Sequence, residues 1–121
     1  MTGERGRVRP EDLLQTTTRR AGDTDERLVV EVSGEVDLHT APMFGDALAA
    51  ALARGPALIV VDLTDVSFLA SIGITILLKA RRSTRLRVVT PEHSGVARTL
   101  RLTGVDEVLG LVSGRADALT P

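Results

Sequence analysis

The order in which strand-like and helix-like segments follow one another is the feature that most limits how this chain can fold. Residues 57–63 form a run that is apolar except for one aspartate, as expected for a strand covered on both faces. Before this run, Phe44, Leu48 and Leu52 recur at helical spacing. They follow Pro42, and proline is favoured in the first turn of a helix. A helix between two strands of one sheet indicates parallel pairing, because a tight hairpin joins only antiparallel strands.

The same alternation continues along the chain and predicts a single α/β domain. We expect strands at 13–19, 28–32, 57–63, 86–90 and 108–112, and helices that begin near Thr40, Ser71, Ser94 and Arg115. The turn-rich segment 21–26 joins the first two strands and predicts an antiparallel hairpin. The predicted architecture is a mixed β-sheet of order β-β-α-β-α-β-α-β-α with helices packed on the sheet. Residues 1–12 are polar and are expected to form a flexible tail, so that the domain spans residues 13–121.

Composition argues against several classes of function. The formal net charge is −1, and two Phe with no Tyr or Trp leave little to stack on bases, so we expect no direct binding of nucleic acid. Cysteine is absent, which excludes disulfides and thiolate chemistry, and only two histidines argue against a histidine-rich metal centre. No apolar run reaches the roughly 18 residues of a membrane span, and the N-terminus shows no secretory signal. We therefore expect a cytoplasmic protein that does not insert into membranes.

Two polar segments are predicted to meet at one edge of the sheet. Residues 33–40 follow the second strand, residues 64–73 follow the third, and each segment leads into a helix. Sites in parallel sheets lie beyond the carboxyl ends of the strands, and consecutive strands often lie side by side. We expect residues 64–70 to be a connection in which Phe68 and Leu69 anchor against the core. This edge is the predicted functional site.

Ser71 has two compatible interpretations. At the start of a predicted helix it can act as an N-cap, its hydroxyl accepting a bond from a backbone N–H of the first turn, and Thr40 has the same expected role at the preceding helix. The Ser71 hydroxyl can also accept a phosphate, whose charge of about −1.5 to −2 would be stabilised by the helix N-terminus. In that case Gly73 would allow the backbone of a partner to come close.

A hydrolytic triad of Ser71 with Asp37 and His39 is a third interpretation, which the sequence disfavours. The nucleophile elbow of α/β-hydrolases carries a glycine two residues before the serine, and this chain has Leu69 there. Asp37 and His39 also lie only two residues apart in one loop. A local hydrogen bond to the backbone of its own turn is the simpler role for Asp37, and an exposed loop position is the simpler role for His39.

Three segments resemble the signatures of STAS domains. Residues 33–41, SGEVDLHTA, are similar to the GELD-xx-TA motif of that family. Residues 62–74, DLTDVSFLASIGI, are similar to its DLS-x-V-x-F-x-DS-[ST]-G-[IL] motif, and residues 100–106, LRLTGVD, resemble its late L-x-x-TGL-x stretch. The segments occur in the family's order, and the resemblance covers about residues 13–112.

The resemblance implies an anti-sigma factor antagonist, which is a binding protein and not an enzyme, and which uses no cofactor or metal. Such proteins bind an anti-sigma factor that is also a serine kinase of the GHKL ATPase type, and this binding frees the sigma factor. Phosphorylation of the antagonist's serine ends the interaction, and a PP2C-type phosphatase restores it. By position, the resemblance makes Ser71 the phosphoacceptor. The residues that it assigns to partner binding are Asp37, His39, Thr40, Ala70, Ile72, Gly73 and Ile74.

Two positions depart from the family motif and keep an alternative open. Ala70 stands where the family usually has Asp, and Ile72 stands where it has a second Ser or Thr. The acceptor hydroxyl is retained, but its acidic and hydroxyl neighbours are not. The alternative is a STAS interaction module that is not phosphorylated and serves in a larger regulatory or transporter-associated complex.

Overall fold

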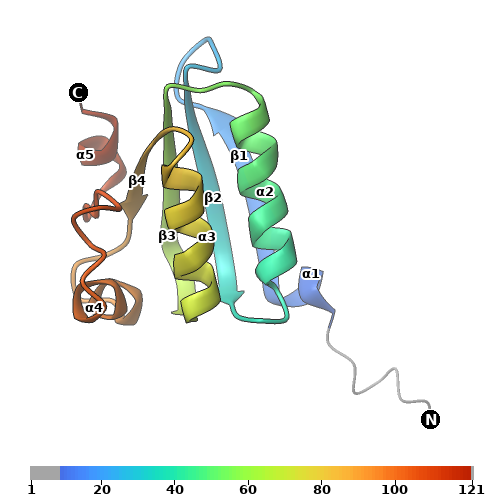
Figure 1. Cartoon of the computed structure of the whole chain (residues 1–121), viewed down its shortest axis with the longest axis vertical. Helices are drawn as coiled ribbons and strands as arrows, with labels where there is room; N and C mark the ends of the chain where they lie inside the picture. Colours follow the sequence, from blue (N-terminus) through green and yellow to red (C-terminus); the bar gives the residue numbers. More distant parts are fainter. Residues whose placement is uncertain (1–8, 121) are drawn as a thin grey trace.

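A four-stranded mixed sheet forms the centre of the protein. The computed structural model describes residues 9–120. β1 (Leu14–Arg20) pairs antiparallel with β2 (Arg27–Val36), β2 pairs in parallel with β3 (Leu58–Leu69), and β3 pairs in parallel with β4 (Arg85–Val89). The strands lie in the order β1-β2-β3-β4 (Figure 1), so the predicted mixed sheet and its leading hairpin are confirmed.

One face of the sheet carries three helices: α2 (Ala41–Ala53), α3 (Ser71–Arg81) and α4 (Gly95–Leu102). α2 and α3 lie side by side over the middle of this face, and α4 lies toward the β4 edge (Figure 1). The helices bury apolar stripes against the strands, and Phe44, Leu77 and Leu100 are fully buried there. This layer contains the main hydrophobic core.

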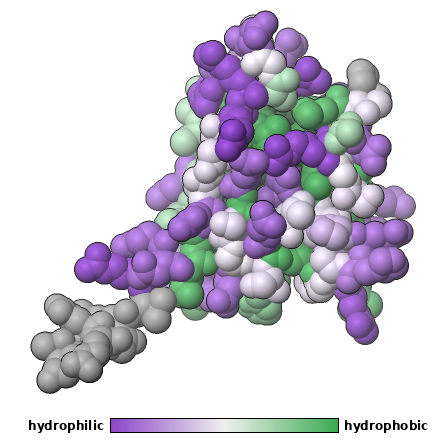
Figure 2. Space-filling model, turned by 180° about the vertical axis from the view of Figure 1, so that it is seen from behind, coloured by the Kyte–Doolittle hydropathy of each residue, from purple (hydrophilic) through white to green (hydrophobic). Residues whose placement is uncertain are grey.

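The opposite face is covered only in part. The short helix α5 (Arg115–Leu119) packs there, and Ala118 joins Val60 and Val89 in a second, smaller apolar cluster. Seen from behind, hydrophilic side chains cover much of this face, with apolar residues visible between them (Figure 2). Such a division is expected when one side of a sheet faces water.

The N-terminal end differs in part from the predicted tail. Residues 1–8 of that tail lie outside the described residues. The remainder forms α1 (Pro10–Leu13), a single helical turn directly ahead of β1, with Pro10 as its first residue. Proline is tolerated there because the first N–H groups of a helix have no partner within the helix.

The last predicted strand, at 108–112, is wrong. Val112 makes one isolated parallel bridge with Val89, and no further ladder is formed by this segment. The backbone N–H groups of residues 109–111 donate instead to carbonyl groups of residues 105–107. Because these groups close local turns, they cannot extend the sheet.

β2 and β3 both run further than their apolar patterns predict. They end at Val36 and Leu69, so most of the predicted connection 64–70 is strand. The β2–β3 pairing shifts register twice, once just before Ser33 and once just before Glu35. Each shift changes which residues point to the core, so the sequence shows no regular alternation that would have indicated a strand.

An ionic cluster joins the β1–β2 hairpin to the end of α2. The Oδ1 atom of Asp25 accepts hydrogen bonds from Nε of Arg20 and Nη2 of Arg54, each at 2.7 Å. The bond from Arg54 and then that from Arg20 lower the pKa of Asp25 from 3.8 to about 2. All three side chains are partly exposed, so solvent screening limits what the pairs contribute to stability.

The depressed pKa of Asp25 predicts a pH dependence of stability. A group of this kind contributes stability above its unfolded pKa, and the contribution is lost as the pH falls toward the folded pKa. We expect the difference in free energy of unfolding between the wild type and Asp25→Asn to shrink as the pH falls from about 4 to about 2. Urea denaturation followed by far-UV circular dichroism measures this difference, since the chain has no Trp or Tyr for fluorescence. A difference that stays constant over this range would contradict the prediction.

Candidate functional site

The carboxyl ends of β2 and β3 bring the two predicted site segments together. Val36 and Leu69 are register partners at the end of the strands, and the N–H of Ala70 donates to the carbonyl oxygen of Val36 at 2.8 Å. Asp37 and Ser71 each follow directly after this hydrogen-bonded pair. The expected meeting of residues 33–40 with residues 64–73 is therefore present in the structure.

Ser71 is exposed and is the first residue of α3. The predicted N-cap role is wrong, because the N-cap is Ala70, in an extended conformation and without a side-chain cap. The Ser71 side chain thus projects from the first turn, where the helix dipole favours negative charge. An exposed hydroxyl at this position is open to a modifying enzyme.

The loop after β2 is held by a compact set of hydrogen bonds around Asp37. One carboxylate oxygen of Asp37 accepts from the backbone N–H groups of His39, at 2.9 Å, and Thr40, at 3.0 Å. The bond from the Thr40 backbone, followed by that from His39, holds the pKa of Asp37 below its usual range. Asp37 is therefore negatively charged at neutral pH, next to the start of α3. The local role expected for this carboxylate is confirmed.

Thr40 is fully buried and builds this loop from inside. Its hydroxyl donates to the carbonyl oxygen of Glu35 at 2.8 Å and accepts from the N–H of Asp37 at 3.0 Å. It stands at the N-cap position of α2 but makes no side-chain cap, so the predicted capping bond is wrong. A buried side chain cannot form a contact surface, and we assign Thr40 to the scaffold of the site.

Gly73 and Ile74 also face inward and not toward a partner. A Cβ atom on Gly73 would lie 2.5 Å from Cδ1 of Leu69 and 2.7 Å from Cγ1 of Val36. Glycine therefore lets α3 pack directly on the ends of β2 and β3, which corrects the expected approach of a partner's backbone. Ile74 is only 7% exposed and belongs to the core.

The remaining predicted contact residues are accessible to different degrees. His39 is exposed, while Asp37, Ala70 and Ile72 are half-buried. Asp37, His39 and Ser71 are the polar side chains of this edge, and Ala70 and Ile72 are apolar. They come from the loop after β2 and from the start of α3.

Two exposed apolar side chains at this edge were not predicted as site residues. Leu38, between Asp37 and His39, is 79% exposed, and Phe68, near the end of β3, is 52% exposed. Leu69 is buried as expected, but the role of Phe68 as a core anchor is wrong, because the register shift before Glu35 leaves Phe68 outside the core. An apolar residue inside a polar turn was the one sequence signal that pointed to Leu38. Large apolar groups at a polar edge are typical of binding surfaces.

Within residues 9–120, no group of three or more His, Cys, Asp or Glu side chains is placed to hold a metal ion. No helix in the same range is long and apolar enough to span a membrane.

The fold is an α/β domain in which the loop after β2 and the start of α3 meet at the carboxyl ends of two parallel strands. The chain belongs to the STAS domain family, because the family model described as "Mlab, STAS domain" matches residues 20–113. The matched range contains both segments of the site.

Two relatives and one solved structure are similar to this chain over most of its length. The chain is 36% identical over 96 residues to the anti-sigma-F factor antagonist RsfB of Mycobacterium tuberculosis, covering 76% of this chain and 78% of the relative. It is 30% identical over 91 residues to an anti-sigma-B factor antagonist of Listeria monocytogenes, covering 72% of this chain and 79% of the relative. It is also similar to the crystal structure of an anti-sigma factor antagonist from Mycobacterium paratuberculosis. That match has a TM-score of 0.78, 34% sequence identity, and coverage of 93% of this chain and 96% of the other.

Proposed function

We propose that this chain is an anti-sigma factor antagonist that is switched by phosphorylation of Ser71. It binds an anti-sigma factor of the GHKL serine-kinase type in the cytoplasm and thereby releases a sigma factor. Phosphorylation of Ser71 by that kinase ends the binding, and a PP2C-type phosphatase restores it. The observation that carries the proposal is the exposed Ser71 hydroxyl at the start of α3, directly beside the loop of Asp37. The names of the relatives support the same role.

The switch follows from the cost of burying charge. Without phosphate, the hydroxyl of Ser71 is small and neutral, so a partner can cover it together with Ile72. A phosphate adds about −1.5 to −2 charges, and burying such a group unpaired costs several kcal/mol. A loss of only about 3 kcal/mol weakens binding more than a hundredfold.

Asp37 strengthens this effect. Its charge is stabilised mainly by backbone N–H groups, so no arginine or lysine beside it is needed to keep it ionised. A phosphate on Ser71 would therefore add to a negative charge already present at the edge. Two like charges under one partner surface are costlier to desolvate than one.

The exposed apolar residues Leu38 and Phe68 are the proposed anchors for the partner. Side chains of this size contribute most when they enter a pocket of the partner and are shielded by polar contacts around them.

A second candidate is a STAS interaction module that is never phosphorylated. Ala70 and Ile72 favour it, because the family's acidic and hydroxyl neighbours of the serine are absent. The two candidates share the same binding edge and differ only in whether Ser71 is a kinase substrate.

A charge placed at Ser71 should weaken binding. We expect Ser71→Asp to lower the affinity for the cognate anti-sigma factor by about tenfold or more, and Ser71→Ala to keep wild-type affinity. Isothermal titration calorimetry measures both. Ser83→Asp is the matched control, since Ser83 is an exposed serine just past the other end of α3, and it should bind as the wild type does. Equal affinities for Ser71→Asp and the wild type would overturn the proposed switch.

Incubation with the cognate kinase and ATP separates the two candidates. We expect intact mass spectrometry to show one added phosphate on the wild type and none on Ser71→Ala. If the wild type binds the anti-sigma factor but stays unmodified, the unphosphorylated module is the correct function.

Leu38 should matter for binding more than an equally exposed leucine elsewhere. Leu38 and Leu102 are 79% and 77% exposed, so truncating either should leave the free energy of unfolding nearly unchanged. We expect Leu38→Ala to weaken binding of the anti-sigma factor about tenfold and Leu102→Ala to leave it unchanged. Equal effects of the two substitutions would remove Leu38 from the contact surface.

A further inference from the structure

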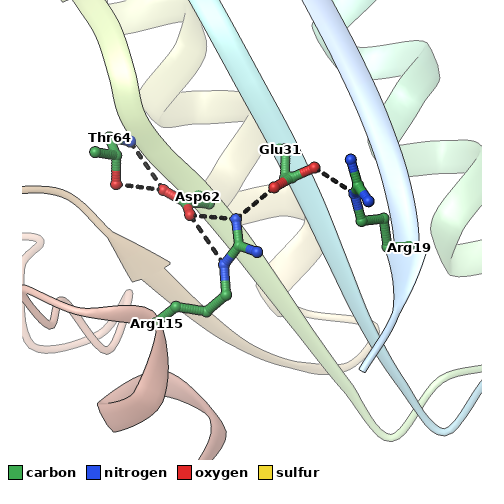
Figure 3. Close-up of polar contacts among 5 residues, drawn as sticks. All are labelled: Arg19, Glu31, Asp62, Thr64 and Arg115. Carbon is green, nitrogen blue, oxygen red and sulfur yellow. Dashed lines mark hydrogen bonds and ion pairs between the residues drawn. The ribbon is translucent and has the colours of Figure 1, made fainter. Parts of the chain in front are cut away.

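A network of charged side chains lies on the face of the sheet opposite α2 and α3. Arg115, at the start of α5, places its guanidinium between Glu31 of β2 and Asp62 of β3 (Figure 3). Its Nη2 atom lies 2.6 Å from Oε2 of Glu31 and 2.7 Å from Oδ2 of Asp62, and its Nε atom lies 3.1 Å from the same Asp62 oxygen. Arg19 of β1 donates to the other oxygen of Glu31 at 2.6 Å.

Glu31 and Asp62 need such a cation because they are direct register partners on neighbouring strands. Like charges opposite each other in a sheet are destabilising. Asp62 is also nearly buried, with 11% of its side chain exposed, so its charge is poorly solvated. Burial would raise the pKa of Asp62, but hydrogen bonds from Thr64 and Arg115 outweigh this effect and bring the pKa below its ordinary value.

The second oxygen of Asp62 holds the point at which β3 leaves its regular register. Oδ1 accepts from the backbone N–H of Thr64 at 2.9 Å and from the Thr64 hydroxyl at 2.5 Å. The first register shift occurs here: Glu31 pairs with Asp62, but Ser33 pairs with Asp65 and not with Thr64. One carboxylate therefore connects α5, through Oδ2, to the shifted segment, through Oδ1.

That shift determines which residues stand opposite each other at the carboxyl ends of β2 and β3. After it, β3 continues in a displaced register to the final pair of Val36 with Leu69, beyond which lie Asp37 and Ser71. Loosening at Thr64 would weaken this displaced pairing, and a change of register by one residue would move Ser71 relative to Asp37.

We propose that Arg115 is a positioning residue that fixes the register of β3 and so the placement of Ser71 beside Asp37. It acts through Asp62 and does not touch a partner. The consequence for partner binding rests on the proposed function, whereas the consequence for the strand does not. The helix α5 thereby takes part in the site from the opposite face of the sheet.

Backbone amide exchange measured by NMR tests the effect on the strand. In Arg115→Gln, we expect exchange at Thr64 and at residues 65–69 to become about tenfold faster, because the Asp62 carboxylate loses the cation that orients it. Amides in the core of α2 should keep their wild-type protection. Arg115→Lys keeps the charge without the forked geometry of the guanidinium, so its exchange rates should lie between those of the wild type and those of Arg115→Gln.

Arg87→Gln is the matched control. Nη1 of Arg87 donates to the carbonyl oxygen of Asp117 at 2.9 Å, so Arg87 also holds α5 on the sheet, whereas the bonds from this part of the chain to Glu31 and Asp62 come from Arg115. It should leave exchange at Thr64 unchanged. Equal acceleration in Arg87→Gln and Arg115→Gln would show that docking of α5 alone matters and would overturn the proposal.

Rescue separates positioning from general stability. In the double variant Arg115→Gln/Asp62→Asn, the amide oxygen can still accept from Thr64 and no buried charge needs a partner. We expect protection at Thr64 to return to within about threefold of the wild type. Failure of the double variant to recover, or unchanged exchange in Arg115→Gln, would exclude the role of Asp62 as the link.

Binding of the cognate anti-sigma factor gives the second readout. We expect Arg115→Gln to bind about tenfold more weakly and the double variant to recover most of the affinity. If the exchange results hold but even the wild type does not bind the anti-sigma factor, the proposed function fails while the positioning role stands. If exchange changes and binding of Arg115→Gln does not, Arg115 has no part in the site.

Discussion

The parallel pairing of β2 with β3 is the constraint on which the site depends. The hydrogen bond from Ala70 to Val36 closes this pairing at its far end, and Asp37 and Ser71 each follow directly after it. The paired strands hold the loop of Asp37 and the first turn of α3 next to each other. Gly73 then allows α3 to pack close enough for its first turn to remain at this edge.

Four carboxylates whose pKa is lowered, Asp25, Glu31, Asp37 and Asp62, differ in the groups that stabilise their charge. Asp25, Glu31 and Asp62 each form ion pairs with arginine, and these pairs hold elements together. Asp37 is held mainly by backbone N–H groups, which stabilise its charge without neutralising it. The field of Asp37 therefore acts outward, at the surface where the proposed partner binds.

Much of this arrangement could be predicted from residue patterns, and the exceptions have physical causes. The helical stripe of Phe44 and Leu48 and the β-branched strands predicted the mixed sheet, because burial at regular spacing leaves a clear signal. The length of β3 could not be predicted, since two register shifts interrupt its alternation.

Other exceptions arose from contacts that no local pattern encodes. The sequence predicts surface positions for Thr40 and Gly73, but Thr40 is buried within its own loop and Gly73 packs against the strand ends. Arg115 was visible only as the first residue of a short helix, and its two acidic partners lie 84 and 53 positions away in the chain.

The start of α3 divides into outward residues, which the proposed function uses for recognition, and inward residues, which the fold needs. Gly73 and Ile74 are committed to the core, whereas positions 70–72 are partly or wholly open to solvent. Substitutions at those three positions therefore require no repacking of the core, as the departures Ala70 and Ile72 from the family motif illustrate. Where a genome encodes several such domains, substitutions in this turn would let each domain bind its own partner and avoid the partners of the others, while the fold stays the same.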